Sequence, residues 1–296
     1  MQIKAVLMRG WLWWQRHVSP GMLAVALTII LVAPMLFIAP IHGYADNGDF
    51  WRAIYPNGIY PFAAIHRSDY FNYVAPHYHL MQYFNEHHTE VYSSQTLFIQ
   101  LALALNRLFY SHTVFDIRFM GAVYFALFLG TIYLLTAALT TPLRRVRSYL
   151  IAIMVVVVFA DSGFTLYFNS FFAEPGSYIA LLTAVAAWLL LARQPKHHRL
   201  LLGLYLLSVV VFVTNKQQNA PIALSFMVVT LGLLAYPQVR RTWPYLVAGL
   251  AVVAASGVVT FALISKDFND INVYQSFTNG VLEENSQPTA AITRAG

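Results

Sequence analysis

The sequence predicts an all-α membrane protein, a polytopic bundle of about seven transmembrane helices. Hydrophobic residues make up 58% of the 296 residues and charged residues only 10%, whereas an average soluble domain is about 25% charged. The apolar residues also gather into runs of the length that crosses a bilayer. We therefore expect one transmembrane domain over residues 1–296, with the lipid bilayer as its main partner.

Each expected span corresponds to one apolar run. The runs cover residues 22–41, 119–139, 149–160, 178–192, 200–213, 222–235 and 245–264. The first run has no small-residue cleavage pattern after it, so it is interpreted as a retained span and not as a signal peptide. Two runs, 149–160 and 200–213, are shorter than a bilayer crossing requires. The polar residues that follow them should therefore line a wet recess in the outer half of the bundle.

The loops between these spans sort by charge. With a cytoplasmic N-terminus, one side receives Lys4, Arg9, Arg16, Arg144, Arg145, Arg147, Arg193, Lys196, Arg199, Arg240 and Arg241. All 12 acidic residues fall on the other side. This is the bias that the positive-inside rule describes. We therefore expect a multi-pass protein of the cell membrane whose functional site faces away from the cytoplasm.

Residues 94–111, SQTLFIQLALALNRLFYS, form a further apolar stretch. A crossing at this point would move every later loop to the opposite side and violate the charge rule. The stretch is therefore expected to be an interfacial or re-entrant helix within a long, helical first outer loop, residues 42–114. Loops of this length are usually functional or disordered, and the many aromatic residues here argue against disorder.

The motif YADNGDFWR, residues 44–52, places the first acidic residues of the chain directly after the first span. Asp46 and Asp49 could each accept a proton from a hydroxyl group, and either could hold a divalent cation. In the alternative interpretation Asp46 is only a helix cap and Gly48 only a turn. Acids so close to an apolar span are costly, which favours a catalytic role. Arg52 is a candidate for binding phosphate.

The same loop carries several histidines, among them His77 and His79. Their spacing puts both imidazoles on one face of a strand, where they could share a metal ion. No further ligand has diagnostic spacing, so no metal ligand is assigned, and hydrogen bonding within the fold or to a substrate is the stronger interpretation. The tyrosines and phenylalanines around them could stack on sugar rings or belong to the interfacial aromatic belt.

A second outer segment, DSGFTLYFNSFFAEP at residues 161–175, adds three candidates. Asp161 is a candidate catalytic acid, and Asn169 and Glu174 are candidates for substrate binding. The alternative makes both acids caps of neighbouring helices.

A third outer segment, TNKQQNAP at residues 214–221, contains Lys216 followed by Gln217. A lysine on an otherwise acidic face can anchor a phosphate as a compact positive charge. The alternative is a lysine that snorkels toward the membrane surface. Lys266, at the start of an outer C-terminal segment over residues 265–296, is a second candidate for the same role.

Other classes of site are disfavoured by what the sequence lacks. Neither GxGxxG nor GxxxxGK occurs, which argues against a dedicated fold for a nucleotide sugar or ATP. The chain has no cysteine, so disulfides and thiolate metal sites are excluded. The net charge of +6 would suggest nucleic acid in a soluble protein, but in a membrane protein the placement of the charges explains it, and no nucleic acid is expected.

The motifs ADNGDFWR, YFNSFFAEP and NKQQN resemble those of the WsfD-type bacterial glycan hexose transferases, within the GT-C superfamily of multi-pass glycosyltransferases. The resemblance implies transfer of a hexose from a polyprenyl-phosphate sugar donor to a cell-surface glycan acceptor on the extracytoplasmic side. It implies that Asp46 or Asp49 is the catalytic base and that the lipid phosphate binds near basic outer residues. It names no certain cofactor and leaves a divalent cation open.

One departure concerns the end of the chain. Such enzymes often continue past seven spans, whereas this chain stops in the polar segment EENSQPTAAITRAG, which indicates a fragment or an enzyme that lacks parts needed for activity. Two other function classes stay open, a glycan-lipid transporter or flippase and a non-catalytic membrane partner of a glycan assembly system. A transporter should carry polar groups near the midplane, whereas here they gather at the outer ends of the spans.

Overall fold

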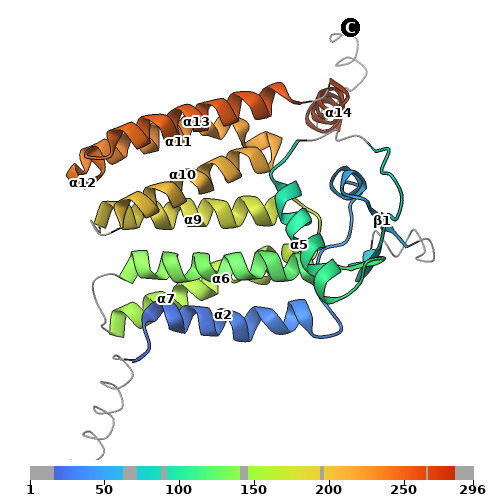
Figure 1. The fold of residues 1–296 in the computed structure, drawn as a ribbon, viewed down its shortest axis with the longest axis horizontal. Helices are drawn as coiled ribbons and strands as arrows, with labels where there is room; N and C mark the ends of the chain where they lie inside the picture. The colour runs from blue at the N-terminus through green and yellow to red at the C-terminus, as the bar shows by residue number, and fades with distance from the viewer. Residues whose placement is uncertain are drawn as a thin grey trace, which may run out of the picture.

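The computed structural model describes residues 17–62, 72–87, 92–140, 146–193, 197–264 and 266–283. The described chain is a bundle of long apolar helices with a small α/β layer at one end (Figure 1). This confirms the predicted all-α polytopic bundle. The predicted charges at Lys4, Arg9, Arg16, Arg144, Arg145 and Lys196 lie outside the described residues, as does the whole segment beyond Glu283.

Among the described residues, six helical segments are long and apolar enough to cross a membrane, and a seventh crossing results if a bent pair counts as one span. The six are α2 (Pro20–Phe37), α6 (Arg118–Thr140), α9 (Glu174–Arg193), α10 (His198–Asn215), the continuous stretch Gln217–Ala235 and α13 (Trp243–Ala262). The bent pair is α7 (Val146–Phe159) with Ser162–Asn169, which meet at 53°. Every predicted span therefore has a helix, because long apolar runs leave the backbone no other way to satisfy its polar groups in lipid.

The bent pair accounts for the short run at 149–160. Helix α7 has 14 residues, about 21 Å of length, against a hydrocarbon core of about 30 Å. Asp161 ends it by capping the short helix α8 (Ser162–Thr165), which continues into η2 (Leu166–Asn169). The short run therefore ends at a bend, and the helical path continues beyond it in α8 and η2.

The other described elements either lie outside these spans or are parts of the stretch Gln217–Ala235. They are α3 (Trp51–Ile54), η1 (Tyr55–Asn57), β1 (Ile59–Pro61), β2 (His77–Leu80), α5 (Gln95–Phe109), β3 (Val114–Asp116), η3 (Gln217–Ile222), α11 (Ala223–Gly232), η4 (Leu233–Ala235), α12 (Pro237–Arg240), α14 (Lys266–Phe277) and the π-helical turn Thr278–Glu283. The strands form an antiparallel sheet in the order β1-β2-β3. This sheet was not predicted beyond the strand at His77 and His79, so the first outer loop is only partly helical.

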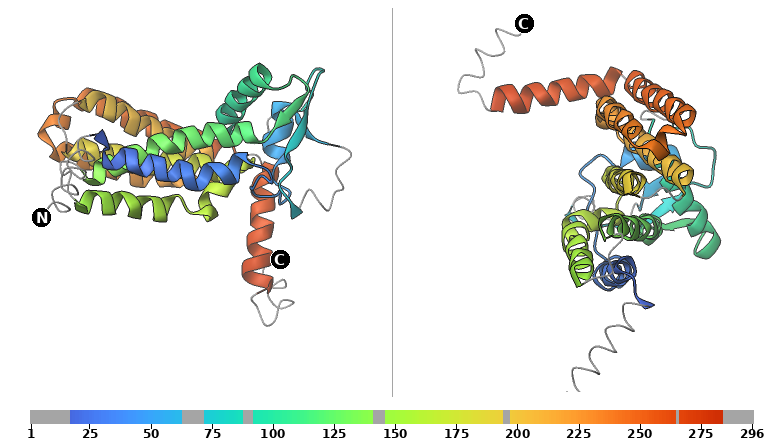
Figure 2. Two further views of the ribbon diagram at one scale, coloured as in Figure 1. Left: turned by 90° about the horizontal axis from the view of Figure 1, so that it is seen from below. Right: turned by 90° about the vertical axis from the view of Figure 1, so that its left-hand side faces the viewer.

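The two ends of the bundle differ in charge. Helix α12, with Arg240 and the adjacent Arg241, lies at one end, whereas α5, the sheet and α14 lie at the other (Figures 1 and 2). We call these the basic end and the acidic end. Helix α5 crosses the acidic end instead of running alongside the spans, which agrees with its exclusion from the span count. Its Leu97, Leu101 and Leu108 form an exposed apolar stripe, the face that an interfacial helix turns toward lipid.

Two hydrophobic clusters hold the bundle together, and α9 belongs to both. One joins α9 to α2, α6 and α7, and the other joins it to α10, α11 and α13. Small residues allow the close approach of α9 and α10, with Ala180, Ala184 and Ala187 all buried. The second cluster does not reach the sheet, whose Tyr78 and Phe115 pack instead against Phe171 in the first cluster.

Candidate functional site

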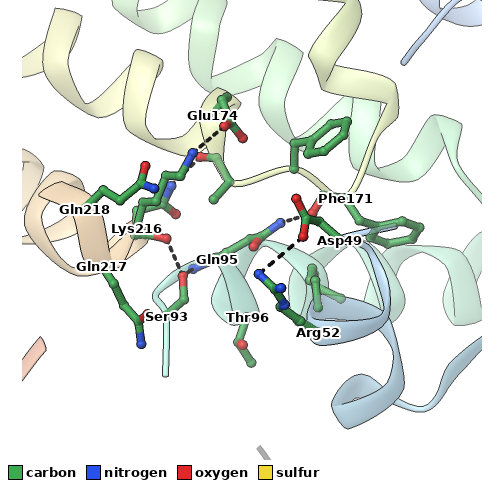
Figure 3. Close-up of a pocket in the computed structure, with 15 residues that line it drawn as sticks. Asp49, Arg52, Ser93, Gln95, Thr96, Phe171, Glu174, Lys216, Gln217 and Gln218 are labelled. Carbon is green, nitrogen blue, oxygen red and sulfur yellow. Dashed lines mark hydrogen bonds and ion pairs between the residues drawn. The ribbon is translucent and has the colours of Figure 1, made fainter. Parts of the chain in front are cut away.

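A cavity of about 140 Å³ opens at the acidic end, where four segments far apart in the sequence meet (Figure 3). The segments are the start of α3, the first turn of α5, the link into α9 and the link out of α10. The lining residues are Asp49, Arg52, Ala53, Ser93, Gln95, Thr96, Ile99, Phe171, Phe172, Ala173, Glu174, Asn215, Lys216, Gln217 and Gln218. Five residues that the sequence singled out are therefore brought together: Asp49, Arg52, Glu174, Lys216 and Gln217.

The turn before α3 places Asp49 at the cavity wall. Asp46 Oδ1 accepts hydrogen bonds from the backbone N–H of Gly48 at 2.7 Å and of Phe50 at 3.1 Å. Gly48 has φ of +99°, a conformation that side-chain-bearing residues rarely adopt. Asp46 is buried and does not line the cavity. In this structure Asp46 shapes the turn, and Asp49, whose side chain is 50% exposed, faces the solvent-accessible space.

The burial of Asp46 makes the stability of the folded protein depend on pH. It raises the pKa of the carboxyl above its ordinary value of 3.8, and the N–H groups of Phe50 and Gly48 only partly oppose this. The folded protein therefore binds more protons than the unfolded chain between those two pKa values. The stability contributed by Asp46 is fully present below pH 3.8 and declines as the pH rises through the raised pKa.

We expect Asp46→Asn to remove this decline, because the amide oxygen can accept the same N–H groups without being charged. The check is the thermal unfolding midpoint in detergent for both proteins across the acidic range. The part of the slope of unfolding midpoint against pH that Asp46 contributes should be absent from the variant. An unchanged slope would show that other groups control the pH dependence.

Two ion pairs line the cavity. Arg52 Nη1 lies 3.2 Å from Asp49 Oδ1 within the turn that begins α3. Lys216 Nζ donates to Glu174 Oε1 at 2.6 Å, which joins the link after α10 to the first residue of α9 (Figure 3). Both pairs are partly exposed, so each is worth about 1 kcal/mol or less to stability. Their charges remain available to a ligand at small cost.

Neutral polar groups surround these pairs. Gln217 is only 6% exposed, yet within the described part of the chain neither its amide nitrogen nor its amide oxygen has a hydrogen-bond partner. Asn215 donates to Ala173 O and Ser177 Oγ, while its Oδ1 also has no partner among the residues that the structure describes. Buried polar groups left unpaired cost about 1–3 kcal/mol each. Such groups at a cavity wall are most simply explained by a polar ligand or ordered water.

A family model described as the YfdI N-terminal transmembrane domain matches residues 7–296, nearly the whole chain. The chain belongs to this family. Neither the curated proteins nor the solved structures contain a match. The family description names a transmembrane domain and no reaction, which agrees with a multi-pass membrane protein.

The first turn of α5 and the residues just before it contribute side chains to the cavity. The sequence did not assign these residues to a site. Ser93 Oγ donates to Asn215 O, and Ser94 bonds the last turn of α10 through Thr214 O and Val211 O. Gln95 is buried and donates to Phe171 O, although the sequence suggested a surface helix at this point. The available signal was the Ser-Ser pair, a helix-start pattern, but nothing local shows that α10 lies beneath it.

Two candidates from the second outer segment lie away from the cavity. Asp161 is exposed, and its carboxylate accepts from Gly163 N at 2.8 Å as the N-cap of α8, which matches the alternative interpretation. Asn169 is fully buried and donates to Leu36 O at 2.9 Å and His42 O at 2.8 Å. It braces the end of α2 and the start of the loop that leads to Asp46, and so it does not face a substrate in this structure.

The remaining candidates also lie elsewhere. His77 Nε2 is 3.6 Å from Asp116 Oδ2, and His79 packs against Phe62 with ring centroids 3.9 Å apart. Both are on β2, as predicted for a strand, but neither lines the cavity. Lys266 is exposed at the start of α14 and does not reach it either. Among the described residues no group of three or more histidines and acids is placed to hold a metal ion.

Proposed function

We propose that this YfdI-family domain is a membrane-embedded glycosyltransferase that moves a hexose from a polyprenyl-phosphate donor to a cell-surface glycan. The observation that carries the proposal is the pairing of two carboxylates with two cations in one cavity at the acidic end of the bundle. Transfer from a lipid phosphate needs a base for the acceptor hydroxyl and cations for the departing phosphate. The cavity holds candidates for both.

Asp49 is the group we assign as general base. Its carboxylate lines the cavity and is half exposed, and Arg52 holds it in position. In the proposed step Asp49 takes the proton of an acceptor hydroxyl while that oxygen bonds to the anomeric carbon of the hexose. The bond from the anomeric carbon to the phosphate oxygen breaks, and its electron pair leaves with the phosphate.

Arg52 and Lys216 are assigned to the phosphate. Negative charge builds on the leaving oxygen, so fixed cations at this place lower the barrier more than they strengthen donor binding. The donor is a lipid, and α5 connects the cavity to the bilayer. Its first turn supplies Ser93, Gln95 and Thr96 to the wall, and its exposed apolar stripe begins at Leu97. An extracytoplasmic location for this end follows from the positive-inside rule and belongs to the proposal.

A transporter or flippase is less well supported. Transport sites usually place charged or polar groups near the bilayer midplane. In the six long spans the charged residues lie in the first or last turn, as Arg118, Glu174, Arg193 and Arg199 do. The polar contacts found deeper in the described bundle include hydroxyl pairs that join helices, such as Thr131 with Thr183 at 2.7 Å and Tyr205 with Thr230 at 2.8 Å.

The test uses the purified chain in lipid nanodiscs with a radiolabelled polyprenyl-phosphate hexose and candidate glycans, with and without chelator. Label that moves into the glycan, together with release of polyprenyl phosphate, supports the proposal. Label that stays on the lipid with every acceptor, while it crosses the bilayer of reconstituted vesicles, would favour transport instead. The chelator arm decides whether a divalent cation takes part.

A further inference from the structure

We propose that the Glu174 carboxylate stands in for the phosphate of the lipid donor, so that donor binding exchanges one anion for another on Lys216. The identity of the anion rests on the proposed function. Three observations about the cavity carry the inference: the contact between Glu174 and Lys216, the charge balance of the cavity wall, and the unpaired amide of Gln217 in that wall.

The contact places an anion where a phosphate would be bound. Glu174 is the first residue of the 20-residue helix α9, and its carboxylate lies 2.6 Å from Lys216 Nζ. The N-terminus of a helix and a lysine ammonium both attract anions. With side chains 41% and 35% exposed, Glu174 and Lys216 form a pair that opens at little cost.

The charge balance makes exchange more favourable than addition. The cavity wall carries Asp49 and Glu174 as acids and Arg52 and Lys216 as bases. A phosphate that entered with both ion pairs closed would meet a wall with no net charge and two carboxylates that repel it. When Glu174 swings away, Lys216 is released for the phosphate at the same place.

The unpaired amide is a hydrogen-bonding group of the same cavity wall that neither ion pair uses. Gln217 directly follows Lys216, is 6% exposed, lines the cavity, and has no partner among the described residues for either side-chain polar atom. The Glu174 carboxylate accepts from Lys216 but not from Gln217. The Gln217 side chain points away from the Glu174–Lys216 contact (Figure 3), so its amide is open to another polar group of the donor headgroup.

Removing the acid should therefore tighten binding. We expect Glu174→Gln to bind a polyprenyl phosphate about 2- to 5-fold more tightly than wild type, the worth of a partly exposed ion pair. Lys216→Gln should weaken binding about tenfold or more, because charge-assisted hydrogen bonds to phosphate are among the stronger ones. Glu174→Asp keeps the charge on a shorter side chain and should lie between wild type and Glu174→Gln.

The experiment measures binding of a fluorescent polyprenyl phosphate to the purified full chain in nanodiscs, without an acceptor. Glu86→Gln is the matched control for the acid, because Glu86 is exposed at the acidic end and outside the cavity. Arg107→Gln, on the exposed face of α5, is the control for the loss of a positive charge. A polyprenol without phosphate and inorganic phosphate as competitor separate recognition of the lipid tail from recognition of the headgroup. Unfolding midpoints confirm that each variant is folded.

Tighter binding by Glu174→Gln, weaker binding by Lys216→Gln and no change in either control support the exchange. Binding by Glu174→Gln that equals wild type or is weaker would overturn it, as would equal gains in Glu174→Gln and Glu86→Gln. The readout needs no turnover. A chain that transfers no hexose but shows this binding order would refute the proposed function and leave the exchange standing, whereas transfer without this order would refute the exchange alone.

Discussion

Replacing Asp49 by asparagine is expected to lower hexose transfer by about 100-fold or more, the usual effect of losing a general base. The substitution keeps the shape of the side chain and removes only its ability to take a proton. Asp49 is the acid of the YADNGDFWR motif that lines the cavity. The initial rate of label transfer into glycan, at donor concentrations above and below saturation, separates loss of turnover from loss of donor binding.

Asp46→Asn is the matched comparison, three residues away on the same non-helical segment. Its amide oxygen can still accept the N–H groups of Gly48 and Phe50, so the turn that presents Asp49 should persist. We expect this variant to keep most of the transfer activity. If Asp46→Asn loses activity while Asp49→Asn keeps it, the roles assigned to the two acids are reversed, and the buried carboxyl is the base.

Replacing Asn169 by alanine should cause the largest loss of stability among the candidate residues. The substitution leaves the carbonyls of Leu36 and His42 without their donor, at a cost of about 1–3 kcal/mol each, or about 2–6 kcal/mol in total. Gly121 packs so closely against the Asn169 amide that a Cβ there would lie 2.2 Å from Oδ1, so the pocket is shaped for this side chain.

The check is the unfolding midpoint in detergent, with Asn269→Ala as the control. Asn269 is exposed on α14, and its loss should change stability by about 0.5 kcal/mol or less. If Asn169 instead bound substrate, as the sequence suggested, Asn169→Ala would lose activity with an unchanged midpoint. That outcome would contradict the bracing role.

The bundle could be predicted from the sequence because its determinants are local. Each apolar run is itself long enough to require a helix in lipid, and the charge bias kept residues 94–111 out of the span count. The sheet could not be predicted in the same way. Strands such as Ile59–Pro61 and Val114–Asp116 have three residues each, too few for an alternating pattern to appear.

The site divides in a similar way. Asp49, Arg52, Glu174 and Lys216 could be found because charges beside apolar runs are costly and need a reason. Gln95 could not, since its burial depends on Phe171, which is 76 positions away in the chain. Asn169 and Asp161 have the residue types of a site, and only tertiary structure reveals that one is a brace and the other a cap.

Because α9 belongs to both hydrophobic clusters, it is the helix along which the two halves of the described bundle meet. Phe50 and Ile54, which flank Arg52, belong to the half built on α2, α6 and α7, whereas Val213, shortly before Lys216, belongs to the half built on α10, α11 and α13. Arg52 and Lys216 are therefore attached to opposite halves of the bundle. A shift of one half along α9 would therefore change the distance between the two cations, so the width of the cavity depends on how the helices pack along the bundle.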